Sequence, residues 1–151
     1  MPTSSDTVSR RFALQYLGDD HTPDGATRYM RFDARAGAQG FTGSCEFEVA
    51  SADIEDFVRI LDGLITTLGG EADLTCGYGS TPSFQLRLSW LDRRGHALLD
   101  CSFATTYRDS LLQSARIYQS IEYAQVTELR DYFKASLTAE PGTRFAIDAP
   151  A

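Results

Sequence analysis

The sequence has few of the residues that most often carry catalysis or cross-link small domains. Its 151 residues include only two histidines and three cysteines. The cysteines, Cys45, Cys76 and Cys101, are far apart, odd in number and without a C-x-x-C pair. Neither a disulfide framework nor a zinc site is therefore predicted. Because all three fall in the inward register of predicted strands, we expect buried, reduced thiols.

Long apolar runs are also missing. Residues 1–11 contain no apolar stretch, and the longest uncharged segment, 74–86, is rich in Gly, Ser, Thr, Pro and Gln. No signal peptide or transmembrane helix is predicted, so we expect a cytoplasmic protein. Basic residues are scarce as well, with 14 against 21 acidic residues and a net charge of −7. This balance argues against binding to nucleic acid phosphates or to an anionic membrane.

Catalytic and cofactor motifs are absent from the sequence. His96, Asp100 and Ser102 share one face of a predicted strand. However, His96 and Asp100 would be roughly 13 Å apart on such a strand, whereas a catalytic triad needs contacts of about 3 Å. The segment 77–80 has two glycines but lacks the lysine and the following helix of a phosphate-binding loop. We predict no catalytic residue, no metal and no cofactor.

Alternation of apolar and polar residues predicts seven strands. The clearest runs from Phe41 to Val49, where odd positions are apolar or small and even positions are polar. Turn-forming residues at 18–25 predict a loop, and those at 92–95 predict a tight hairpin turn. The predicted strands are 12–17, 27–35, 41–49, 71–78, 84–90, 97–103 and 115–123.

Two segments have helical spacing. Apolar residues between Ile54 and Leu68 recur at steps of three and four, which predicts a helix that Ser51 or Asp53 caps and that ends at Gly69-Gly70. A shorter helix is predicted at 127–137. The order βββ-α-ββββ-α indicates an α+β domain, with a largely antiparallel sheet of six or seven strands covered on one face by two helices. Within it we expect a flexible arm at 1–10, one domain at 11–140 and a loose tail at 141–151.

The acidic excess is confined to one part of the chain. Between Glu46 and Asp73 there are eight acids and one base, and the rest of the chain has equal numbers of each. The start of the predicted helix accounts for three of these acids, because the helix dipole favours negative charge there. Four others, on the predicted strands, point away from the core. The candidate interface carboxylates are Glu46, Glu48, Glu71 and Asp73, with Glu55, Asp56 and Asp62 as a second patch.

If the strands at 41–49 and 71–78 are neighbours, the first four carboxylates form a strip without an interleaved cation. Such a strip would attract a basic protein partner and specify it. A solvated acidic face that only keeps the protein soluble explains the same residues. The sequence alone leaves both interpretations open, and it leaves the oligomeric state open too.

The pattern from Phe41 to Leu137 resembles small bacterial immunity and immunity-like proteins of the WapI type. The resemblance rests on Phe41-x-Gly43-x-x-x-Phe47-x-Val49, Asp56-Phe57-x-x-x-Leu61-x-x-Leu64, Gly70-x-Ala72-x-Leu74 and the hairpin at 92–95. It implies a cytoplasmic, non-enzymatic protein that binds and neutralises a cognate toxin or effector, usually encoded beside it.

Two other function classes fit the sequence. One is a small-molecule-binding domain with a pocket between sheet and helix. The other is a hydrolase whose polar groups converge only in the folded protein. The candidate pocket residues are Phe84, Leu86, Trp90, Leu99, Phe103 and Tyr107, and packing of the core explains them equally well.

Overall fold

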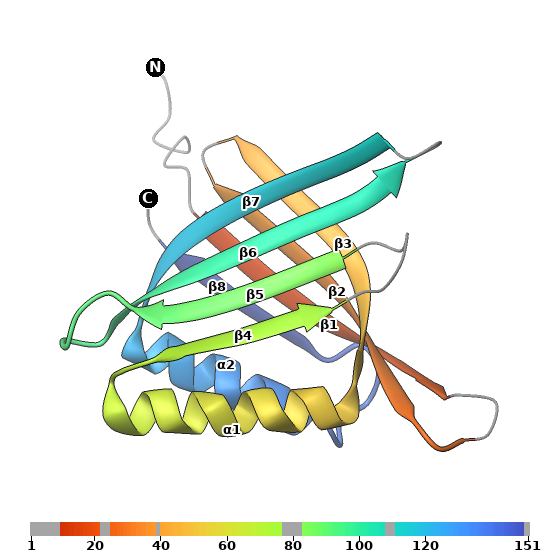
Figure 1. Ribbon diagram of the computed structural model, residues 1–151, viewed down its shortest axis with the longest axis horizontal. Coiled ribbons are helices and arrows are strands. Elements are labelled where there is room, and N and C mark those ends of the chain that lie inside the picture. Colours follow the sequence, from red (N-terminus) through yellow and green to blue (C-terminus); the bar gives the residue numbers. More distant parts are fainter. Residues whose placement is uncertain (1–9, 22–24, 39, 77–82, 108–110, 150–151) are drawn as a thin grey trace.

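The chain folds into eight strands and two helices (Figure 1). The computed structural model describes residues 10–21, 25–38, 40–76, 83–107 and 111–149. The strands are β1 (Arg10–His21), β2 (Arg28–Ala38), β3 (Phe41–Ala50), β4 (Glu71–Cys76), β5 (Ser83–Trp90), β6 (His96–Tyr107), β7 (Leu111–Glu122) and β8 (Arg144–Ala149). The helices are α1 (Ser51–Thr67) and α2 (Tyr123–Ser136).

The strands form two antiparallel sheets, so the α+β class is confirmed but the single sheet of six or seven strands is wrong. One sheet has the order β3-β2-β1-β8 and the other the order β4-β5-β6-β7. The apolar faces of both sheets contribute to one buried core. Alternation along a strand shows which side chains are buried but not whether a helix layer or a second sheet buries them. That ambiguity is the physical reason for the error.

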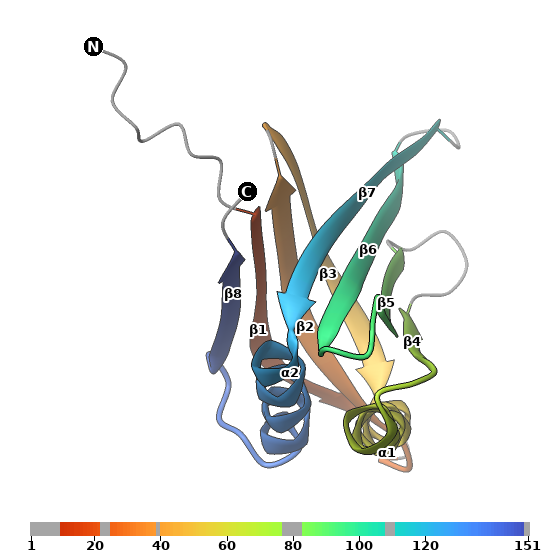
Figure 2. The same ribbon diagram turned by 90° about the vertical axis from the view of Figure 1, so that its left-hand side faces the viewer.

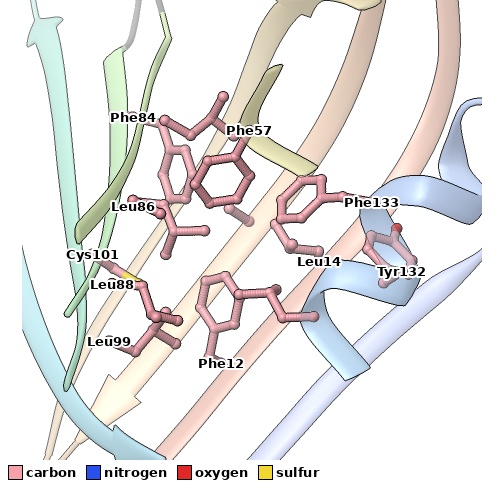
Figure 3. Close-up of a cluster of buried hydrophobic side chains, with 14 of the residues drawn as sticks. Phe12, Leu14, Phe57, Phe84, Leu86, Leu88, Leu99, Cys101, Tyr132 and Phe133 are labelled. Carbon is pink, nitrogen blue, oxygen red and sulfur yellow. The ribbon is translucent and has the colours of Figure 1, made fainter. Parts of the chain in front are cut away.

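Aromatic rings connect the layers of this core (Figure 3). Phe47 of β3 stacks on Phe84 of β5 with a centroid distance of 4.4 Å, which joins the two sheets. Phe57 of α1 meets Phe133 of α2 edge to face at 5.3 Å. Phe133 also contacts Phe32 of β2 at 6.0 Å. The helices and the first sheet therefore share one aromatic cluster.

The two helices lie side by side at one end of the sheets (Figure 2). The first helix buries the predicted apolar stripe but has no side-chain cap at its start, where Ala50 is the N-cap. The proposed capping by Ser51 or Asp53 is therefore wrong. The C-cap is Leu68, which is left-handed with φ 53°, and Gly70 of the predicted Gly69-Gly70 exit also has a positive φ, 89°. The indole Nε1 of Trp90 donates a hydrogen bond to the carbonyl of Leu64 at 3.0 Å, so β5 holds this end of α1.

Two predicted loop segments are strands. The first strand continues through a bulge at Leu17 to His21, although residues 18–25 were expected to form a loop. Residues 144–149, expected in a loose tail, form β8 and pair with β1. Two backbone hydrogen bonds join Tyr16 to residues 142 and 143 and lead the chain into β8. Ile147 of β8 is buried in the core, so this segment belongs to the domain.

Candidate functional site

The carboxylates of β3 lie on the outer face of the first sheet, beside an arginine. Arg31 of β2 is opposite Glu48 in the register. Its guanidinium lies 3.5 Å from a carboxylate oxygen of Glu46 and 3.8 Å from one of Asp20. A hydrogen bond with Asp20 raises the pKa of Glu48, partial burial adds to the rise, and the charge of Arg31 opposes it. The predicted outward register of Glu46 and Glu48 is correct, but a cation lies between them.

The carboxylates of β4 lie on the outer face of the second sheet and also meet an arginine. Arg87 of β5 is 3.4 Å from Glu71 and 3.3 Å from Asp73. Asp73 also accepts hydrogen bonds from Thr75 at 2.7 Å and from Gln85 at 2.9 Å. Glu71 remains two-thirds exposed, so its carboxylate stays accessible to a partner.

The strands at 41–49 and 71–78 are not neighbours in one sheet, so the condition for a single strip of four carboxylates is not met. Glu46 and Glu48 belong to one sheet, and Glu71 and Asp73 belong to the other. Because the apolar faces of the sheets point into a shared core, their polar faces point in different directions. Both strands are edge strands, and α1 connects them along the chain. The two carboxylate pairs therefore lie on the outer faces of different sheets, on two edge strands that α1 connects along the chain.

The first helix, which follows β3 and precedes β4 in the chain, carries further carboxylates. Asp53, in its first turn, and Asp73 of β4 both act electrostatically on the thiol of Cys76, so the start of α1 lies near β4. Asp56 pairs with Arg59 on the same helix. Glu55 is exposed, and no described side chain forms an ion pair with it. Asp62 differs from the others, because Arg130 of α2 binds it at 2.9 Å.

We use the name acidic edge for the carboxylates on β3, in the first two turns of α1 and on β4, together with Asp20 near the end of β1. Eight acids and three arginines lie there, so the edge remains acidic after local pairing. The acids are Asp20, Glu46, Glu48, Asp53, Glu55, Asp56, Glu71 and Asp73, and the arginines are Arg31, Arg59 and Arg87. Exposed pairs of this kind contribute about 0–1 kcal/mol each to stability. They leave the carboxylates free to exchange partners.

The histidine and aspartate that share a strand with Ser102 are bound elsewhere. The ring Nδ1 of His96 is 2.7 Å from Asp92 and lowers the pKa of that carboxyl. Asp100 is buried and accepts two hydrogen bonds from Arg116, at 3.0 Å and 2.7 Å. Asp100 therefore orients Arg116 rather than His96.

Burial favours the protonated form of all three cysteine thiols. Burial raises the pKa of Cys45 to about 11 and that of Cys76 to about 12. Burial raises the pKa of Cys101 as well. Cys76 and Cys101 are buried and Cys45 is half-buried, so the expectation of buried thiols holds for two of the three. Within the described residues, no group of three or more His, Cys, Asp or Glu side chains could hold a metal ion.

The aromatic and aliphatic residues proposed to line a pocket mostly fill the core. Phe84, Leu86 and Leu99 are essentially inaccessible to solvent. Phe103 is buried too but forms one wall of a groove of about 210 Å³ between β3 and the ends of β6 and β7. That groove lies between the two sheets, whereas the prediction placed a pocket between sheet and helix. The side chain of Tyr107 lies outside the described residues.

Sequence reasoning missed a second hollow, on the outer face of the first sheet. It measures about 250 Å³ and is surrounded by Arg11, Arg35 and Arg144. The outward positions of the first two follow from strand alternation, but Arg144 belongs to β8, which the sequence did not predict. Strand alternation therefore indicated two of the three arginines around this hollow and gave no indication of the third.

Comparisons with known proteins give no family assignment. No family model matches the chain, and no curated protein matches it. Among solved structures, the chain is similar to the plant transcriptional regulator PBF-2, with a TM-score of 0.47 and 12% sequence identity. The match covers 85% of this chain and 74% of that one. No helix in the described part of the chain is long and apolar enough to cross a membrane.

Proposed function

We propose that this chain is a non-enzymatic protein-binding module, and specifically a bacterial immunity protein that neutralises a cognate toxin or effector. The observation that carries the proposal is the acidic edge, where eight carboxylates outnumber three arginines on β3, the start of α1, β4 and the end of β1. A surface of one sign raises the association rate with a partner of the opposite sign and disfavours other partners. The partner that fits is a basic protein.

The geometry of the edge suits a partner that contacts both sheets. Glu46 and Glu71 are exposed by 64% and 66%, and each is held only loosely by an arginine, at 3.5 Å and 3.4 Å. A basic side chain from a partner can therefore replace Arg31 or Arg87 at low cost. The exposed carboxylate of Glu55, at the start of α1, gives a third contact point.

Protection of the edge strands offers a purely structural explanation of the same acids. β3 and β4 are the outermost strands of their sheets, and charged side chains on edge strands prevent pairing between molecules. This explanation predicts that the acids affect self-association and have no effect on partner binding. The two explanations therefore differ in a measurable way.

The test uses the toxin domain encoded by the neighbouring reading frame and the double variant Glu46→Gln/Glu71→Gln. We expect the association rate at low salt to fall roughly three- to tenfold, with a weaker dependence on salt. The matched control, Glu128→Gln/Glu140→Gln, removes two exposed carboxylates that lie on and beyond α2. The control should leave the rate unchanged.

An unchanged rate and salt dependence in the Glu46→Gln/Glu71→Gln variant would refute the acidic docking surface. If that variant instead forms dimers or larger species in size-exclusion chromatography while binding remains intact, edge protection accounts for the acids. A neighbouring protein that does not bind at all, even to the unaltered chain, would contradict the immunity function.

A further inference from the structure

The turn between β5 and β6 is held in one shape by its own hydrogen bonds. The N–H of Leu91 donates to the carbonyl of His96 at 2.8 Å and closes the hairpin. One oxygen of Asp92 accepts hydrogen bonds from the N–H groups of Arg94 at 2.7 Å and His96 at 3.2 Å. The other oxygen is 2.7 Å from Nδ1 of His96. Figure 1 shows this turn projecting past the end of α1. Because the turn is already ordered, little conformational entropy is lost when a partner binds it.

The turn carries two exposed arginines, Arg93 and Arg94. No described carboxylate forms an ion pair with either of them, since Asp92, the acid beside them in the sequence, is bound to His96 and to the main chain. In contrast, the three arginines of the acidic edge each pair with an acid. The turn is therefore a positive projection on a protein whose net charge is −7.

Exposed apolar side chains accompany these arginines. Leu91 is 55% exposed, and Tyr123, at the start of α2, is 43% exposed. Tyr123 packs against the turn, because a Cβ atom added at Gly95 would lie 3.0 Å from the Cβ of Tyr123. Its ring also stacks on Trp90 with a centroid distance of 6.1 Å. Tyrosine and arginine are enriched among the residues that dominate protein–protein binding. We use the name basic hairpin for Leu91, Arg93, Arg94 and Tyr123.

The charge of the basic hairpin selects a negatively charged partner surface. The acidic edge of the same protein is such a surface, and its Glu46 and Glu71 are about two-thirds exposed. Every copy of the chain therefore carries both a positive projection and a negative surface, and the two form no described ion pair within one copy. We propose that the basic hairpin binds the acidic edge of a second copy of this chain.

Association of this kind is head to tail, because the two contact surfaces differ. Head-to-tail contacts continue into open chains or close into rings. Two copies with a net charge of −7 also repel each other, so we expect weak association that depends on protein concentration. Since the contact covers the acidic edge, it competes with a basic partner for that surface. This competition rests on the proposed function, whereas the self-association does not.

The test is sedimentation velocity of the full chain over a wide range of protein concentrations at moderate salt. We expect the mean mass to rise with concentration. Arg93→Glu/Arg94→Glu should weaken the association roughly tenfold or more. The matched control, Lys134→Glu/Arg144→Glu, makes the same change in net charge at two exposed cations of α2 and β8. The control should still associate, and circular dichroism checks that both variants fold.

A mixing experiment identifies the surface that the basic hairpin binds. Glu46→Lys/Glu71→Lys reverses two charges of the acidic edge and leaves the basic hairpin intact, so this variant by itself should stay monomeric. Mixed with Arg93→Glu/Arg94→Glu, it should form a complex, because each variant supplies the surface that the other has lost.

Four results would overturn the proposal. These are an unaltered chain that stays monomeric at every concentration, association that persists in Arg93→Glu/Arg94→Glu, an equal loss in the control variant, and no complex in the mixture. Exposed arginines that serve only solubility would give the second result if the chain associates through another surface. The chain is its own partner in these experiments, so their outcome does not depend on whether a toxin binds it.

Discussion

At the scale of single residues, one glycine allows the two sheets to approach each other. A Cβ atom added at Gly43 of β3 would lie 2.8 Å from the ring of Phe103 of β6. The ring is buried and also contacts Phe84, so it has little room to move. Overpacking of this kind costs about 1–3 kcal/mol of stability. Alanine is roughly 0.5–1 kcal/mol more favourable than glycine within a strand, which offsets part of this cost. We expect Gly43→Ala to lower the free energy of unfolding by about 1 kcal/mol in urea denaturation.

A second glycine serves as the control, because replacing it by alanine should raise the free energy of unfolding instead of lowering it. Gly63 lies in α1, and an added Cβ there would meet no atom within 4 Å. Gly63→Ala should therefore raise stability by roughly 0.5–1 kcal/mol, because glycine is a poor helix former. In a Phe103→Leu background the cost of Gly43→Ala should shrink, since the clashing ring atoms are gone. A cost that stays the same in that background would show that Phe103 is not the cause.

At the scale of elements, a hydrogen bond between Asp20 of β1 and Glu48 of β3 makes the stability of the fold depend on pH. The hydrogen bond with Asp20 raises the pKa of Glu48 in the folded state. The folded protein therefore binds more protons than the unfolded chain above about pH 4.3, the usual pKa of a glutamate. Stability falls as the pH rises from there through the raised pKa. Glu48→Gln should remove this loss, which urea denaturation at a series of pH values will measure.

The control for the pH prediction is Glu46→Gln. It removes a carboxylate beside the same Arg31 but leaves the hydrogen bond between Asp20 and Glu48 in place. The loss of stability with rising pH should therefore persist in Glu46→Gln. If both variants follow the same pH profile, the Asp20–Glu48 pair is not its source.

The pattern of apolar and polar residues in short windows was sufficient to predict most helices and strands. It was insufficient for a strand that forms by pairing with a segment far away in the sequence. The period between Ile54 and Leu68 and the alternation from Phe41 to Val49 are visible in short windows, and both predicted elements are present. In contrast, β8 is short and follows Pro141-Gly142, which normally ends an element. It becomes a strand because β1, more than 120 residues earlier, offers it an edge and a buried place for Ile147.

The candidate site also has a part that the sequence predicts and a part that it does not. Alternation correctly placed Glu46 and Asp73 outward. The arginines beside them, Arg31 and Arg87, come from neighbouring strands, so their positions depend on strand order and register. Neither property can be read from one strand alone. The hollow around Arg144 was missed for the same reason, since it requires β8.

At the scale of the whole molecule, the shared core predicts that the two sheets unfold together. Ile147 of β8 is 2% exposed and lies in the same cluster as Leu86 and Leu88 of the other sheet. Trp90, the only tryptophan, lies on β5 of that other sheet. Ile147→Ala should cost about 2–5 kcal/mol, the usual range for removing a buried isoleucine side chain. The loss should appear at the same urea midpoint in tryptophan fluorescence and in far-ultraviolet circular dichroism.

The neighbouring residue provides the control for this prediction. Ala146 is exposed on the outer face of the same strand, so Ala146→Ser should change stability by less than about 0.5 kcal/mol. If Ile147→Ala moves the circular dichroism transition while the Trp90 transition stays in place, the two sheets are separate folding units. If both transitions move to the same lower urea concentration, β8, which pairs with β1 in the first sheet, stabilises the second sheet through the core that both sheets share.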